Sequence, residues 1–163
     1  MLEKLDFMMR FWDLKARHES LGAPLTPVER IELLSLLGLM ATDDPLPLAG
    51  PPPRSEHALE AQVTTHGGFV GVEVRMVCAR GLVVACLTPF PKGQSTVVRL
   101  VDDATGVEYT VPCVVEWGIE GTPSAMALRV DGAPARMAFV DEPEGLAWGS
   151  AIGWVAEPSA PAE

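Results

Sequence analysis

The sequence has few of the residues that catalysis and metal binding require. It contains three cysteines, Cys78, Cys86 and Cys113, with no C-x-x-C pair, and three scattered histidines. Neither a disulfide framework nor a zinc site is expected from this spacing. The motifs of serine hydrolases, zinc proteases, P-loops and dinucleotide-binding folds are absent from the chain. We therefore predict a non-enzymatic protein with no catalytic residue, no metal and no cofactor.

Positive charge and long apolar runs are also scarce. Twelve Lys and Arg residues face 22 Asp and Glu residues, a net charge of −10 with no basic run. Such a chain repels phosphate backbones, so nucleic acid is not an expected partner. No apolar stretch reaches the ~18 residues that a membrane span needs. The first residues mix acids and bases, unlike a signal peptide, so the expected location is the cytoplasm.

Apolar residues with helical spacing fill the first part of the chain. Leu5, Met8, Met9 and Trp12 follow one helical face and predict a helix over residues 2–20. The segment LGAPLTP then ends this helix, because Gly22 suits a helix C-terminus and proline cannot continue one.

A second helix is predicted to begin directly afterwards and to end near Met40. Thr26 and Glu29 form a T-x-x-E capping box around Pro27, which suits the first helical position. This helix is apolar nearly all round, so it must be buried on several sides. Packing within the chain alone, a hairpin that oligomerises and binding to a membrane surface all remain open. For binding to a membrane surface, the hairpin lacks the Lys/Arg face that anionic lipid needs.

The remainder of the chain divides at a proline-rich segment. Five prolines between residues 41 and 58 rule out regular structure there. We predict a helical hairpin over residues 1–41, a linker over 42–58, a β-barrel over 59–156 and a disordered tail over 157–163.

Beyond the linker, β-branched residues alternate with polar ones, which is typical of strands. Strands are predicted over 59–65, 70–76, 81–87, 96–101, 107–117, 125–130 and 135–140. Pro112 predicts that its strand lies at an edge or contains a bulge. Asp131-Gly132 predicts a hairpin turn into the seventh strand. Residues 145–155 favour neither helix nor strand. The predicted fold class is α+β, mainly β, with a six- to seven-stranded antiparallel barrel.

The order of strands and turns resembles that of the PilZ family. The family shows G-L-x-V, a P-x-G turn, V-x-L, V-x-W and a final G-V-R-F strand. The corresponding segments here are Gly81–Val84, Pro91–Gly93, Val98–Leu100, Val115–Trp117 and Ala127–Val130. The resemblance covers roughly residues 59–130 and implies a six-stranded barrel in a bacterial signalling protein.

The residues with which that family binds cyclic di-GMP are missing. Met76 stands where its [DN]-x-S-x-x-G motif has Asp or Asn, and Cys78 stands where it has Ser. Gly81 remains, although a turn that needs positive φ explains a glycine equally well. Ala58 follows Arg54 by four residues, so no R-x-x-x-R exists. Losing these charge-assisted contacts removes roughly 4–8 kcal/mol of binding free energy.

The resemblance implies an adaptor that regulates bacterial motility or signalling through protein–protein contacts without binding cyclic di-GMP. One alternative is an atypical cyclic di-GMP receptor that uses Arg75 and Arg80. A second is a scaffold that forms homo-oligomers through its hairpin. The candidate interaction surfaces lie on the hairpin and on the barrel face near its second turn. Their residues are Phe7, Phe11, Trp12, Leu36, Arg80 and Trp117.

Overall fold

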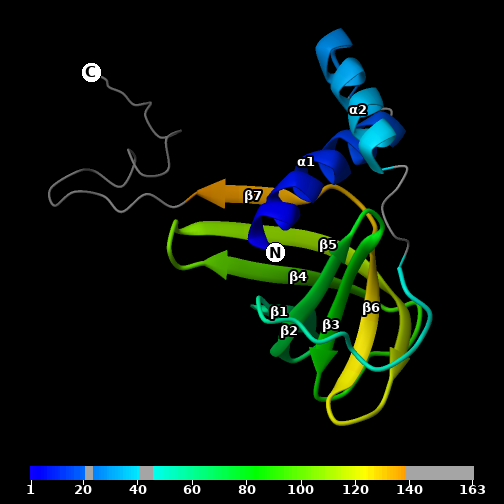
Figure 1. The fold of residues 1–163 in the computed structure, drawn as a ribbon, viewed down its shortest axis with the longest axis vertical. Coiled ribbons are helices and arrows are strands. Elements are labelled where there is room, and N and C mark those ends of the chain that lie inside the picture. Colours follow the sequence, from blue (N-terminus) through cyan, green and yellow to red (C-terminus); the bar gives the residue numbers. More distant parts are fainter. Residues whose placement is uncertain (21–23, 41–45, 139–163) are drawn as a thin grey trace, which may run out of the picture.

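The computed structural model describes residues 1–20, 24–40 and 46–138. Two helices precede seven strands (Figure 1). The helices are α1 (Leu2–Glu19) and α2 (Pro27–Met40). The strands are β1 (Leu59–Thr65), β2 (Gly68–Cys78), β3 (Gly81–Cys86), β4 (Ser95–Asp102), β5 (Val107–Ile119), β6 (Ser124–Val130) and β7 (Ala135–Ala138). The predicted α+β, mainly β class is confirmed. The predicted barrel beyond residue 138 and the tail over 157–163 lie outside the described residues.

Six of the strands close into an antiparallel barrel. The order β4-β1-β2-β3-β6-β5 is completed by pairing between β4 and β5. Inward-facing positions alternate along β4 and β5, as the sequence pattern predicts. β3 is buried along its whole length. Because the sheet closes on itself, none of these six strands is left as a free edge.

Helix α1 covers one end of the barrel. Its apolar face joins a single core with side chains from all six barrel strands. Leu5 reaches inward beside Val74, Leu100 and Tyr109. The Tyr109 hydroxyl donates to Asp6 Oδ1 at 3.3 Å, and Arg136 Nε of β7 donates to the same oxygen at 2.7 Å. The N-terminal helix is therefore part of the barrel's core rather than a separate unit.

A β-bulge in β2 changes which residues face the core. Val74 pairs with Val84 and Met76 pairs with Val83, so Arg75 is the extra residue. Period-two alternation along this strand places Met76 on the same face as Val72 and Val74. That prediction is wrong, because the bulge puts Val77 into the core and leaves Met76 only half-buried.

The predicted hairpin between the last two strands is also wrong. β7 does not pair back on β6; both lie antiparallel to β5, one after the other along the same side. For Pro112, the bulge alternative is confirmed and the edge alternative is not, because β5 is a central strand with a bulge between Val115 and Trp117. Pro112 is tolerated because β7 pairs with residues 107–110 and β6 begins pairing at Cys113, so no partner on that side needs the missing N–H.

The linker is held against the barrel by its backbone carbonyls. Trp117 Nε1 donates to the carbonyl of Pro47 at 2.7 Å. Arg75 donates to the carbonyl of Pro53 at 3.1 Å. Figure 1 shows residues 46–58 running along the outside of the barrel before entering β1.

Candidate functional site

The turn between β2 and β3 carries the motif positions singled out in the sequence. Cys78 pairs with Gly81, so only Ala79 and Arg80 form the loop. The Cys78 side chain is buried, as are those of Cys86 and Cys113. Burial raises the pKa of the Cys113 thiol to about 12, and it also raises the pKa of Cys86. The thiols of Cys86 and Cys113 therefore stay protonated at neutral pH.

Gly81 is required for a reason that the sequence does not reveal. The glycines with positive φ are Gly68, Gly93, Gly106 and Gly132, so the positive-φ explanation for Gly81 is wrong. Gly81 pairs with Arg129, and β6 approaches its Cα very closely. A Cβ at Gly81 would lie 1.9 Å from the carbonyl oxygen of Leu128. Glycine is therefore needed here so that two backbones can pack together.

Helix α1 lies directly over this turn. Trp12 is 3% exposed, and its Nε1 donates to the carbonyl of Ala79 at 2.8 Å. Beside it is a cavity of 440 Å³ with cations and carboxylates on its walls. Its charged lining residues are Lys15, Glu19, Arg80, Arg129 and Asp131. Because both signs are present, the cavity does not concentrate positive charge.

The two arginines of the alternative nucleotide site do not come together. Arg80 is exposed beside Trp12, whereas Arg75 lines a separate 430 Å³ cavity with Arg54. Arg75 is already engaged by Glu73 and by the Pro53 carbonyl. A single ligand phosphate therefore cannot contact both guanidinium groups in this structure.

Half of the six predicted interaction residues are not on the surface. Phe11, Trp12 and Leu36 are all buried in the core. Phe7 is 40% exposed, Arg80 is exposed, and Trp117 is half-buried against the linker. Large apolar side chains on helices predict burial, and three of these are used to pack the chain's own core.

The largest group of exposed apolar side chains among the described residues lies instead on α2. Only Leu33 and Leu36 of this helix are buried. Met40 is partly buried against the core. Five other large apolar side chains are between 44% and 74% exposed, and we call them the outer face of α2: Val28, Ile31, Leu34, Leu37 and Leu39. Packing within the described chain therefore does not cover this helix. The sequence shows that this helix is apolar nearly all round. It does not show which side of the helix stays exposed.

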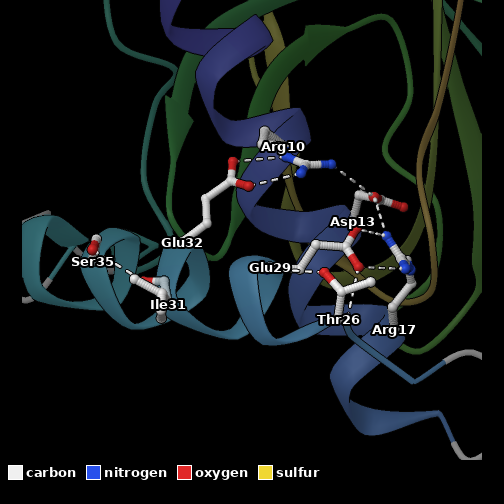
Figure 2. A network of polar contacts seen from close by, with 8 residues as sticks. All are labelled: Arg10, Asp13, Arg17, Thr26, Glu29, Ile31, Glu32 and Ser35. Atoms are coloured by element: carbon white, nitrogen blue, oxygen red, sulfur yellow. Dashed lines mark hydrogen bonds and ion pairs between the residues drawn. The ribbon is translucent and has the colours of Figure 1, made fainter.

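Ion pairs with α1 fix the orientation of α2. Arg10 donates to both carboxylate oxygens of Glu32, at 2.8 and 2.7 Å. Arg17 donates to both oxygens of Glu29, at 2.5 and 3.0 Å. Figure 2 shows that both glutamates extend from α2 toward α1, which α2 crosses at an angle. Paired N–H donors make these contacts directional, so they hold α2 in one rotation about its axis.

The predicted capping box at the start of α2 is present. The Glu29 N–H donates to Thr26 Oγ1 at 3.2 Å, and the Thr26 N–H donates to Glu29 Oε1 at 2.9 Å. The hydrogen bonds from Arg17 and then from Thr26 lower the pKa of Glu29 from 4.5 to about 2. The pKa of Glu32 is lowered mainly by its hydrogen bond with Arg10. One glutamate thus both caps α2 and ties it to α1.

Acid should weaken this attachment. A carboxylate whose folded pKa is depressed adds stability above its unfolded pKa and loses it as the pH falls. For Glu29 that loss falls between pH 4.5 and about 2. We expect wild type to melt at a higher temperature than Glu29→Gln at neutral pH, with the difference vanishing across this window. Thermal melts followed by circular dichroism test this, with Glu120→Gln in an exposed loop as the control. A difference independent of pH would contradict it.

No family model, curated protein or solved structure matches this chain. Within residues 1–20, 24–40 and 46–138, no group of three or more His, Cys, Asp or Glu side chains gathers as a metal site. Neither described helix is long and apolar enough to cross a membrane. Among the described features, the outer face of α2 is best suited to an intermolecular contact.

Proposed function

We propose that this chain is a non-enzymatic, PilZ-like adaptor that works through protein–protein contacts made by the outer face of α2. The main support for this proposal is the exposure of five large aliphatic side chains on one short helix. Together they expose roughly 500 Å², and apolar patches of about 300–600 Å² on monomers are often functional. Covering that surface with another protein removes it from water and supplies the driving force for binding.

The barrel and α1 serve as the support for this helix. α1 is anchored in the barrel core, and its two arginines hold α2. Binding surfaces on rigid supports lose little conformational entropy when a partner docks. A role in bacterial motility or signalling comes from the PilZ resemblance and is part of the proposal.

The separation of Arg75 and Arg80 favours the adaptor over the nucleotide receptor. A receptor for an anionic dinucleotide needs several guanidinium groups directed at one ligand, because each charged contact adds about 1.5–3 kcal/mol. Here one arginine is engaged with the linker and the other lies beside Trp12. The net charge of −10 further opposes an anionic ligand.

Photo-crosslinking tests the docking surface directly. We expect p-benzoylphenylalanine in place of Leu34 to form an adduct with a second polypeptide in living cells. The same group in place of Leu87, which is 88% exposed on the barrel, should form none. A crosslink only within one chain, which leaves the mass of a single chain, would show that the outer face of α2 is not a protein-docking surface. The absence of any crosslink from position 34 would show the same.

A further inference from the structure

We propose that the outer face of α2 docks on the same face of a second copy of this chain, with the two helices antiparallel. This inference rests on the proposed function, because it names the partner of the same surface. A two-fold pair of this kind brings one patch against itself, which is the commonest arrangement of homo-oligomers.

The apolar area matches what a dimer requires. A standard interface buries ~800 Å² per partner, and homodimer interfaces are about 65% apolar, so roughly 520 Å² of apolar surface is needed on each chain. The outer face of α2 exposes roughly 500 Å² of large aliphatic side chains, within the size range of functional patches. The exposed apolar area is therefore on the scale that a dimer interface requires, with Ile31 and Leu34 at its centre and Val28, Leu37 and Leu39 beside them.

The spacing along α2 suits a helix–helix contact. Pro27, Ile31, Leu34 and Gly38 follow one another at intervals of four, three and four residues, the spacing of a coiled-coil seam, and all four are exposed. A Cβ added at Gly38 meets no atom within 4 Å, so the backbone is open to close approach there. An antiparallel pair centred between Ile31 and Leu34 places Ile31 against the partner's Leu34 on both sides of the two-fold axis.

Charge favours this face and this direction. Two chains of net charge −10 repel each other. The acidic residues of α2, Glu29 and Glu32, are turned to α1 and paired with its arginines (Figure 2). No carboxylate of α2 therefore has to meet another across the seam. Since α1 holds the N-terminal half of α2, antiparallel helices also keep the two acidic barrels apart.

The oligomeric state of the full chain tests the proposal. Multi-angle light scattering over a concentration series should give twice the 17.4 kDa of one chain. Leu34→Glu and Ile31→Glu should each raise the dimer dissociation constant at least about 100-fold, because each charge would be buried twice in the interface. Leu87→Glu, at an exposed barrel residue, should remain a dimer. A wild type that is monomeric at every concentration would overturn the proposal.

Mixing two variants tests the direction of pairing. Ile31→Lys alone should be monomeric, like Leu34→Glu. Mixed in equal amounts, they should form a heterodimer, because Lys at 31 meets Glu at the partner's position 34 while Ile31 still meets Leu34 on the other side. A mixture that stays monomeric would overturn the antiparallel arrangement. Circular dichroism confirms folding, which these exposed positions should not disturb.

The two proposals fail in different ways. If purified wild type is monomeric but position 34 crosslinks to a different polypeptide in cells, the self-pairing is overturned and the adaptor surface stands. If wild type is monomeric and position 34 gives no adduct, both are overturned.

Discussion

Gly81→Ala should destabilise the protein by about 3 kcal/mol or more, because the new methyl group would overpack a site that cannot yield. The atoms it would strike belong to the backbone: the carbonyl oxygen of Leu128 at 1.9 Å and the Cα of Arg129 at 3.0 Å. A flexible side chain can move away from a new methyl group, but a β6 backbone hydrogen-bonded on both sides cannot. Urea unfolding followed by circular dichroism measures the loss.

Gly71→Ala is the matched control. Gly71 lies in neighbouring β2, it is exposed, and a Cβ added there meets no atom within 4 Å. The change should shift the free energy of unfolding by no more than about 0.5 kcal/mol. If the two alanine variants were equally stable, the close approach of β3 and β6 at Gly81 would be refuted.

Trp12→Ala should cost about 3–5 kcal/mol, the usual range for truncating a large buried aromatic side chain. The indole fills the space between α1 and the β2–β3 turn and is bonded to the Ala79 carbonyl. Its loss removes a buried contact and a hydrogen bond that hold this part of α1 on the barrel. Equilibrium denaturation monitored in the far ultraviolet gives the free energy of unfolding without relying on indole fluorescence.

Trp12→Phe separates packing from hydrogen bonding. The phenyl ring retains most of the buried area but has no N–H, so the expected loss is about 1 kcal/mol from the hydrogen bond plus a small packing term. An alanine variant no less stable than the phenylalanine variant would show that α1 does not depend on this residue.

The positions of the strands along the chain were predictable from the sequence because alternation of apolar and polar residues is a local signal. The exceptions arise from non-local pairing. The bulge at Arg75 depends on how β2 meets β3, and the position of Pro112 depends on where β6 gives way to β7. Likewise, the need for glycine at position 81 comes from β6, which follows it by more than forty residues.

The sequence predicted the apolar character of the candidate site on α2 but not its position on the helix. The number of leucines in α2 indicated that one helix could not cover them all. Which side remains exposed is decided by Arg10 and Arg17, which lie on the other helix. Conversely, Trp12 and Phe11 were predicted as possible contact residues because an apolar helical face indicates burial but not the surface that buries it.

The anchoring of α1 also has a consequence for how the chain is made. Trp12 meets Ala79 across 67 residues, Asp6 meets Tyr109 across 103, and Asp6 meets Arg136 across 130. During synthesis, the apolar face of α1 therefore has no barrel to cover until nearly all the strands have left the ribosome. Contacts this distant in sequence form slowly, and exposed apolar segments in the meantime favour aggregation. We expect the nascent N-terminal helices to be a preferred binding site for chaperones, released only when β5 and β7 have joined the sheet.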